Sequence, residues 1–335
     1  MLLQVESRKQ STLPLMETGS KMSTYAVTGG IGLVGSHVAR ALVARGDKVR
    51  VLDNFTNGNM KTINDFRGRI DLRMGDIMRR EDVMWLTDDV DVLIHCAAQT
   101  DPMKAWKNPE DTAHSNINGT LSVLQACKDN KVKRVVYISC AGIYGSAGLL
   151  PMGEHEPFHP LNPLAISKLA AERYCMMWEE HGVFECVSLR VFEVYGAAVN
   201  GTINDNRIVP HIINSALTNK PIALPGGGKQ VRDFVHASDV AKAVLAASDL
   251  DRKGLSGREI NIGTNRSTSY ESFAADVIKA AGSTSTIVKS DPRPGESDYL
   301  VADISLAEQL LSYSPAVSLS DGIEKTINML RIMTS

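Results

Sequence analysis

Three glycines, at positions 29, 32 and 35, lie between an expected strand at residues 24–28 and an expected helix that runs from about residue 34 to Gly46. Glycines at this spacing can make a tight turn, let the backbone approach a ligand, and let helix and strand pack closely. The first amides of the helix then offer hydrogen bonds and a positive dipole end to phosphates. Taken alone, the pattern also fits a simple tight turn between strand and helix.

Asp53 supplies the second feature of a dinucleotide site. It follows an expected strand at residues 48–52 and stands 24 positions beyond Gly29. A carboxylate at this place can accept hydrogen bonds from both hydroxyls of an adenosine ribose, and it would repel a 2′-phosphate. The glycines, their flanking elements and Asp53 together predict a dinucleotide site that prefers NAD to NADP.

Short β-branched runs alternate with helical patterns along the first two thirds of the chain. The expected strands are residues 24–28, 48–52, 70–74, 91–97, 134–139, 185–191 and 259–262, and further helices are expected at 117–128 and 167–181. Strands separated by helices imply right-handed crossovers. The sequence therefore predicts an α/β fold with a doubly wound parallel (Rossmann) sheet and a smaller C-terminal substrate-binding lobe.

The expected division of the chain has three parts. Residues 1–22 read as a flexible N-terminal extension. Residues 23–191 together with about 235–262 form the NAD-binding Rossmann domain. Residues from about 192 to 234 together with 263–335 form the substrate-binding lobe, which is rich in turn residues and ends in a helical region from about residue 306 to residue 333.

Charge and cysteine content exclude several classes of protein. There are 36 Lys and Arg against 38 Asp and Glu, so the net charge of −2 gives no reason to expect nucleic acid or a membrane surface as a partner. No apolar run reaches the ~20 residues of a membrane-spanning helix. Five cysteines without a C-x-x-C pair argue against a disulfide framework and a metal site. With no signal peptide in view, a cytoplasmic protein is expected.

Several further segments match one family in order. They are residues 51–58, 75–77, 95–99 and 137–145, and Asn116 ahead of Gly119-Thr120. From about residue 25 to the C-terminus the chain resembles the extended short-chain dehydrogenase/reductase superfamily, specifically the NAD-dependent epimerase/dehydratase family that acts on nucleotide sugars. The resemblance implies that NAD is held by Gly29, Gly32, Leu33, Val34, Gly35, Asp53, Asn54, Asp76, Ile77, Ala97, Ala98, Gln99, Asn116 and Lys168.

The catalytic positions depart from the family's pattern. Members use a Tyr to take a sugar hydroxyl proton, and a Lys four residues later to hold the nicotinamide ribose. Lys168 is in place, but Leu164 stands at the Tyr position and Cys140 at the Ser/Thr position. Glu193 replaces an Asn, and Ala105 stands where a small polar residue is expected. Either activity is lost, or the proton transfer has moved to other residues.

Candidates for a moved role are Cys140, Glu193 and, less directly, Tyr144 or Tyr195. Each change also has an interpretation without a catalytic role. Cys140 can be an inert buried thiol, Leu164 a packing residue and Glu193 a solvated or salt-bridged carboxylate. The favoured hypothesis makes Cys140 the acid/base, with Lys168 orienting the ribose and Glu193 as a second proton carrier. In it, a cation such as Lys168 or the nicotinamide ring lowers the pKa of the thiol.

The resemblance also implies the substrate and its contacts. Arg232 and Arg293 match the family's two phosphate-contacting segments, so a nucleotide sugar, a UDP-sugar above all, is the expected partner, and a homodimer is the expected assembly. The favoured function is an NAD-dependent nucleotide-sugar epimerase or dehydratase with non-standard acid/base residues. The alternatives are a catalytically silent NAD-binding regulatory or scaffold protein and an NAD-dependent sugar dehydrogenase.

Overall fold

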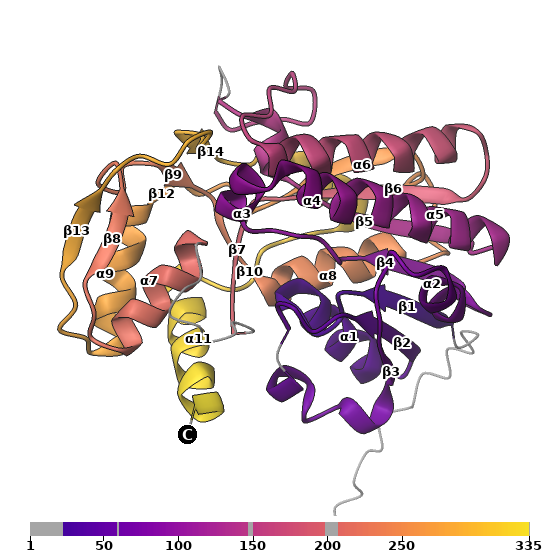
Figure 1. The fold of residues 1–335 in the computed structure, drawn as a ribbon, viewed down its shortest axis with the longest axis horizontal. Coiled ribbons are helices and arrows are strands. Elements are labelled where there is room, and N and C mark those ends of the chain that lie inside the picture. Colours follow the sequence, from indigo (N-terminus) through magenta and orange to yellow (C-terminus); the bar gives the residue numbers. More distant parts are fainter. Residues whose placement is uncertain (1–22, 59, 147–149, 198–206, 335) are drawn as a thin grey trace, which may run out of the picture.

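The computed structural model describes residues 23–58, 60–146, 150–197 and 207–334, and the expected extension at residues 1–22 lies outside this part. Its larger portion is built on a seven-stranded, wholly parallel sheet in the order β11-β6-β5-β4-β1-β2-β3 (Figure 1). The strands are β1 (Thr24–Thr28), β2 (Lys48–Asp53), β3 (Asp71–Met74), β4 (Val92–His95), β5 (Arg134–Cys140), β6 (Glu185–Val191) and β11 (Arg258–Ile262).

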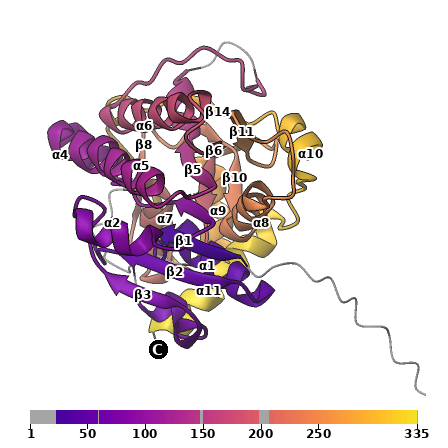
Figure 2. The ribbon, with the colours of Figure 1, turned by 90° about the vertical axis from the view of Figure 1, so that its right-hand side faces the viewer.

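Helices cover both faces of this sheet, as the two main apolar cores show (Figure 2). One face carries α1 (Leu33–Arg45), α8 (Ala237–Ser248) and α10 (Ser305–Leu311). The other face carries α2 (Arg80–Thr87), α5 (Gly119–Asp129) and α6 (Pro163–Glu180). Central strands such as β4 are buried on both sides, which explains their continuous apolar runs. The predicted doubly wound α/β fold is confirmed.

A smaller lobe with its own apolar core completes the molecule (Figure 1). Its core elements are α7 (Ile208–Leu217), β8 (Ile222–Pro225), α9 (Tyr270–Ala281), β13 (Ile287–Ser290) and α11 (Leu319–Thr334). Two further short sheets are separate from the main sheet. One pairs β7 (Glu193–Tyr195) with β10 (Phe234–His236), and the other is three-stranded, with β9 (Val231–Arg232) between β12 (Thr268–Ser269) and β14 (Tyr299–Leu300). The chain leaves the main sheet after β6 and returns to it through α8 at β11.

Two helical regions differ from the sequence-based expectation. The helix expected at residues 167–181 begins at Pro163, because the Asn162 side chain accepts a hydrogen bond from the Ala165 amide at 2.9 Å and proline fits the first helical turn. The helical C-terminus is divided into α10 and α11. Ser312 adopts a left-handed conformation with φ 53° at the end of α10, and Pro315, which has no amide hydrogen, follows it.

Short helical segments connect β4 to α5 near the carboxyl edge of the sheet. They are α3 (Pro102–Lys107), α4 (Pro109–Ala113) and a π-helical turn at His114–Asn118. Within the described ranges, no helix is long and apolar enough to cross a bilayer. Nor does the described part bring three or more His, Cys, Asp or Glu side chains together as a metal site would.

Candidate active site

The strand order reverses between β1 and β4, which leaves a crevice at the carboxyl ends of the strands where α/β proteins bind ligands. A cavity of about 820 Å³ opens there and extends to the small lobe. All the predicted site residues except Asn116 line it, namely Gly29, Gly32, Leu33, Val34, Gly35, Asp53, Asn54, Asp76, Ile77, Ala97, Ala98, Gln99, Cys140, Lys168, Glu193, Arg232 and Arg293.

The glycine turn is packed too tightly for side chains. A Cβ on Gly29, whose φ is +66°, would lie 2.9 Å from the Ala97 backbone, and one on Gly35 would lie 2.1 Å from the Gly29 carbonyl oxygen. Gly32 stands at the N-terminus of α1, which has no capping side chain. A phosphate can therefore take the place that a capping oxygen would occupy.

Asp53, at the end of β2, fixes the neighbouring loop and faces the cavity. Its two carboxylate oxygens accept hydrogen bonds from the Phe55 amide at 2.8 Å and the Ile31 amide at 3.1 Å. Burial raises the pKa of the carboxyl, and the two amide donors act in the opposite direction. One side chain thus ties β2 to the glycine turn and presents acceptors to the cavity.

Asn116 does not line the cavity, and its role is to hold a residue that does. Its side-chain oxygen accepts from the Gln99 amide at 2.7 Å, and its nitrogen donates to the Gln99 carbonyl at 3.0 Å and to Ser167 Oγ at 2.9 Å. It therefore connects the end of β4 to α6. Asp76, after β3, accepts a hydrogen bond from the Met78 amide at 2.9 Å.

The hydrogen-bond donors and acceptors at this end of the cavity are those that NAD requires. The uncapped helix start suits a diphosphate, the Asp53 carboxylate suits ribose hydroxyls, and the glycine turn leaves room where side chains would block the approach.

Lys168 comes from α6, one turn after Leu164, and reaches the carboxyl end of β5. Its Nζ donates to the Ile138 carbonyl and lies 4.4 Å from the centre of the Tyr137 ring. Burial lowers the pKa of Lys168, while Cys140 and Cys96 act in the opposite direction. The ammonium group is thus fixed near the carboxyl end of β5.

Cys140 is the last residue of β5, and its half-buried thiol lines the cavity. Burial raises the pKa of this thiol, and the lowering effect of Lys168 does not offset it. The charge of Lys168 thus acts on the thiol in the expected direction, but burial outweighs it, so the pKa of Cys140 stays above its ordinary value. Leu164 lines the same cavity and brings no ionisable group to it, whereas Ala105 is fully buried in α3.

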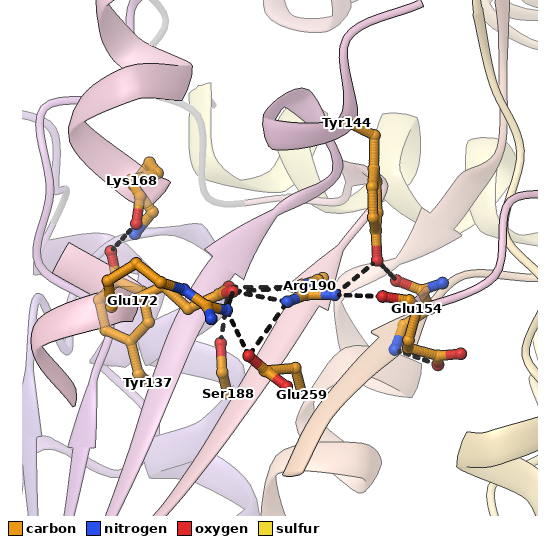
Figure 3. A network of polar contacts seen from close by, with 10 residues as sticks. Tyr137, Tyr144, Glu154, Lys168, Glu172, Ser188, Arg190 and Glu259 are labelled. Atoms are coloured by element: carbon orange, nitrogen blue, oxygen red, sulfur yellow. Dashed lines mark hydrogen bonds and ion pairs between the residues drawn. The ribbon is translucent and has the colours of Figure 1, made fainter. Parts of the chain in front are cut away.

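The two tyrosines considered as alternative proton carriers have hydrogen-bond partners within the protein. Tyr144 is buried and does not line the cavity, and its hydroxyl donates to Asn261 at 2.7 Å. The same hydroxyl accepts a hydrogen bond from Arg190 at 3.0 Å, as Figure 3 shows. The Tyr195 hydroxyl donates to the Leu319 carbonyl at 3.4 Å, at the start of α11. Burial raises the pKa of both phenols above their ordinary range. Both hydroxyls are thus held by hydrogen bonds within the protein.

At the lobe end, two arginines, two carboxylates and a tyrosine from four elements line the cavity together. Glu193 comes from β7, Arg232 from β9 and Tyr270 from the start of α9; Arg293 and Glu296 come from the loop between β13 and β14. Sequence reasoning did not single out Tyr270 or Glu296. Glu296 stands three residues after Arg293, so its place beside a predicted phosphate contact could have indicated it. No motif in the sequence around Tyr270 indicates a site residue.

Comparisons with known proteins agree with this geometry. The model of the NAD dependent epimerase/dehydratase family matches residues 25–263. A UDP-glucose 4-epimerase of Lacticaseibacillus casei is 32% identical over 91% of this chain and 94% of its own length. The solved Thermotoga maritima UDP-glucose 4-epimerase with UDP-glucose has a TM-score of 0.86 at 27% identity, over 93% of this chain and all of the other.

A third relative was solved with both ligands. The Bacillus cereus UDP-glucuronic acid 4-epimerase, in complex with UDP-glucuronic acid and NAD, has a TM-score of 0.84 at 30% identity, over 92% of this chain and 99% of the other. The family match covers well over half of the chain and the L. casei relative covers nearly all of it. The chain belongs to the NAD-dependent epimerase/dehydratase family.

Proposed function

We propose that this protein is an NAD-dependent enzyme that modifies a nucleotide sugar, with a UDP-sugar as substrate and 4-epimerisation as the favoured reaction over dehydration. The observation that carries the proposal is the single cavity that joins the dinucleotide end at Gly29 and Asp53 to the arginine pair of the lobe. Cys140 lines the same cavity at the end of β5, which stands between β4 and β6 in the sheet, and this supports a role at the reacting sugar. Relatives named as UDP-sugar epimerases support the substrate class.

Our assignment of the cofactor contacts follows the cavity lining. The start of α1 would hold the diphosphate, Asp53 an adenosine ribose, and Lys168 the nicotinamide ribose. When bound, NAD would supply hydride transfer to and from a sugar carbon.

The chain's own residues must then move a proton at the sugar hydroxyl. We assign this to the Cys140 thiol, because it lies in the cavity beside the fixed ammonium of Lys168, whose charge favours the thiolate. Glu193 is a second group in the same cavity that can hold a proton, since burial raises its pKa. A general acid/base of this kind contributes about 10²–10⁴-fold to turnover.

The experiment is proton NMR of UDP-glucose and UDP-N-acetylglucosamine incubated with the protein, together with the absorbance of NADH. Epimerisation gives a new sugar isomer without net NADH. A 4-keto-6-deoxy sugar, formed by loss of water and return of the hydride without net NADH, would make the enzyme a dehydratase, and accumulation of NADH would make it a dehydrogenase. If neither UDP nor any UDP-sugar binds, the nucleotide-sugar assignment is overturned.

Arg293→Ala tests the substrate end separately. It should weaken UDP binding by about 10-fold or more while leaving NAD affinity unchanged, because arginine pairs strongly with phosphate. Arg266→Ala is the matched control, since Arg266 is exposed and does not line the cavity. Calorimetric titration gives both affinities. Equal loss in the two variants would contradict a specific phosphate contact.

A catalytically silent NAD-binding protein is the second candidate, favoured by Leu164 in the cavity wall at the family's Tyr position. It predicts binding of NAD without any change in the sugar. Detection of isomer in the NMR experiment would exclude it.

A further inference from the structure

The arginines proposed to hold the substrate's phosphates share their place with two carboxylates. Arg232 Nε lies 3.7 Å from Glu193 Oε2, and Arg232 Nη2 lies 3.7 Å from Glu296 Oε1. Both separations are longer than a hydrogen bond. The charge of Arg232 is thus divided between two acids that do not fill its hydrogen-bonding capacity.

The surroundings hold Arg232 in this position. Its Nη2 donates to the Ser297 carbonyl at 2.8 Å, its Nη1 donates to the Val231 carbonyl at 2.9 Å, and the guanidinium lies 4.9 Å from the centre of the Tyr270 ring. Only 3% of the residue is exposed. Arg232 therefore cannot move out to meet a ligand. A phosphate that binds it must enter this position, where it also lies close to Glu193.

Glu193 has few ways to move away from such a phosphate. Its Oε2 accepts a hydrogen bond from the Tyr270 hydroxyl at 3.1 Å, and Arg232 and Arg293 are the cations that act on it. Glu296 adds a second negative charge across Arg232, and Arg207 lines the cavity from the start of α7. With both acids ionised, the two acids and the two arginines that face them sum to zero charge.

A nucleoside diphosphate would bring two negative charges to this neutral group. Placing anionic oxygens beside an ionised carboxylate is unfavourable, and in a partly buried site the carboxylate takes a proton instead. A protonated carboxyl changes from an acceptor into a hydrogen-bond donor, which is the chemistry that a phosphate oxygen requires.

We propose that Glu193 takes up one proton from solvent when a nucleoside diphosphate binds at Arg232 and Arg293, and that it then donates a hydrogen bond to a phosphate oxygen. This inference rests on the proposed function and adds to it: the site recognises the diphosphate together with a proton. Glu193 is accordingly a specificity-determining residue of the anion site.

The linkage between binding and pH has a definite sign. Burial already raises the pKa of free Glu193, and the bound phosphates raise it further. Below the pKa of the free form Glu193 is protonated in both states, so affinity does not change with pH. Between the free and bound pKa values affinity falls as pH rises, by up to about tenfold per pH unit, and above both it is constant again.

The test is titration of the NAD-loaded protein with UDP-glucose at a series of pH values, in buffers of different ionisation enthalpy. UDP-glucose is the probe because its diphosphate keeps a constant charge, whereas the terminal phosphate of UDP titrates near pH ~6. The expected result is uptake of up to one proton and an affinity that weakens as pH rises. Glu193→Gln should abolish both effects and bind at high pH as tightly as the parent does at low pH.

Glu154→Gln is the matched control. Burial also raises the pKa of Glu154, but this residue does not line the cavity, so proton uptake should persist in the variant. Binding without proton uptake in the parent, or equal uptake in Glu193→Gln, overturns this inference and leaves the proposed function standing. No binding of UDP-glucose to either protein at any pH overturns the proposed function, and this inference with it.

Discussion

Two thiols stand at the ends of adjacent strands and line the same cavity, Cys140 at the end of β5 and Cys96 just after β4. The charge of Lys168 acts on both, but burial raises the pKa of Cys96 to about 12. Cys96 therefore serves as an internal control for the proposed role of Cys140, because both thiols line one cavity and feel the same cation.

If Cys140 is the base, activity requires its thiolate. Because burial raises its pKa, kcat/KM should rise with pH through the alkaline range, above the ordinary thiol value of about 8.5. Cys140→Ser should remove this rise and lower turnover by about 10²–10⁴-fold. Cys96→Ser should preserve the rise. Full activity in Cys140→Ser, measured on the sugar that reacts, would make Cys140 structural.

Asp53 carries a prediction about cofactor choice. The parent should bind NAD more tightly than NADP, and Asp53→Asn should lose about 1.5–3 kcal/mol of NAD binding with the charge-assisted contact. Asp71→Asn, on the exposed side of β3, is the control. Calorimetric titration with both dinucleotides measures the effect. Equal affinity of the parent for NAD and NADP would remove Asp53 from this role.

Among the elements, α6 combines a site residue with a structural one. Lys168 faces the cavity, and Glu172, one turn later, is fully buried against Arg190 of β6 (Figure 3). The carboxylate lies 2.7 Å from Arg190 Nη2 and accepts a hydrogen bond from Ser188 at 3.0 Å. Burial alone would raise the pKa of Glu172, but the hydrogen bond and charge of Arg190 lower it below its usual value.

Breaking this pair should destabilise the fold strongly. Glu172→Gln leaves Arg190 as a buried charge without its main partner, at a cost of about 3–5 kcal/mol in the free energy of unfolding. Arg173→Ala removes a half-exposed contact to the same carboxylate and should cost about 1 kcal/mol or less. Urea unfolding measures the free energy of unfolding of both variants, provided that its dependence on urea concentration has the same slope as in the parent. Because the pKa of Glu172 is lowered, the contribution should persist at neutral pH and disappear only in acid.

The elements also show what the sequence could predict. The glycine turn, Asp53 and the strands of the sheet follow from short β-branched, apolar runs and from turn residues, so short stretches of sequence are enough to locate them. The partners around Arg232 could not be found in this way. Tyr270 and Glu193 lie 77 positions apart, and only the folding of the lobe brings them to 3.1 Å. The rise in the pKa of Cys140 likewise depends on the burial of its thiol, and this burial cannot be predicted from the residues around it in the sequence.

For the whole molecule, we expect a homodimer formed through α6. Its outer face carries Ile166, Tyr174 and Met177, of which 53%, 38% and 40% are exposed, and the three fall on one helical stripe. Met177→Glu should shift sedimentation equilibrium towards the monomer. Val288→Glu, at a residue of β13 that is 41% exposed, should not. A monomeric parent at micromolar concentration would contradict the expectation.

The position of β11 late in the sequence matters while the chain is being synthesised. It begins 67 positions after β6 ends, since the chain builds β7 to β10 and α8 in between. At about 5–20 residues per second a ribosome needs roughly 3–13 s for this stretch. Until then β6 is an open edge with unpaired amides and carbonyls, which invites pairing with other chains. A newly made chain therefore stays prone to edge-to-edge association until its last sheet strand is in place.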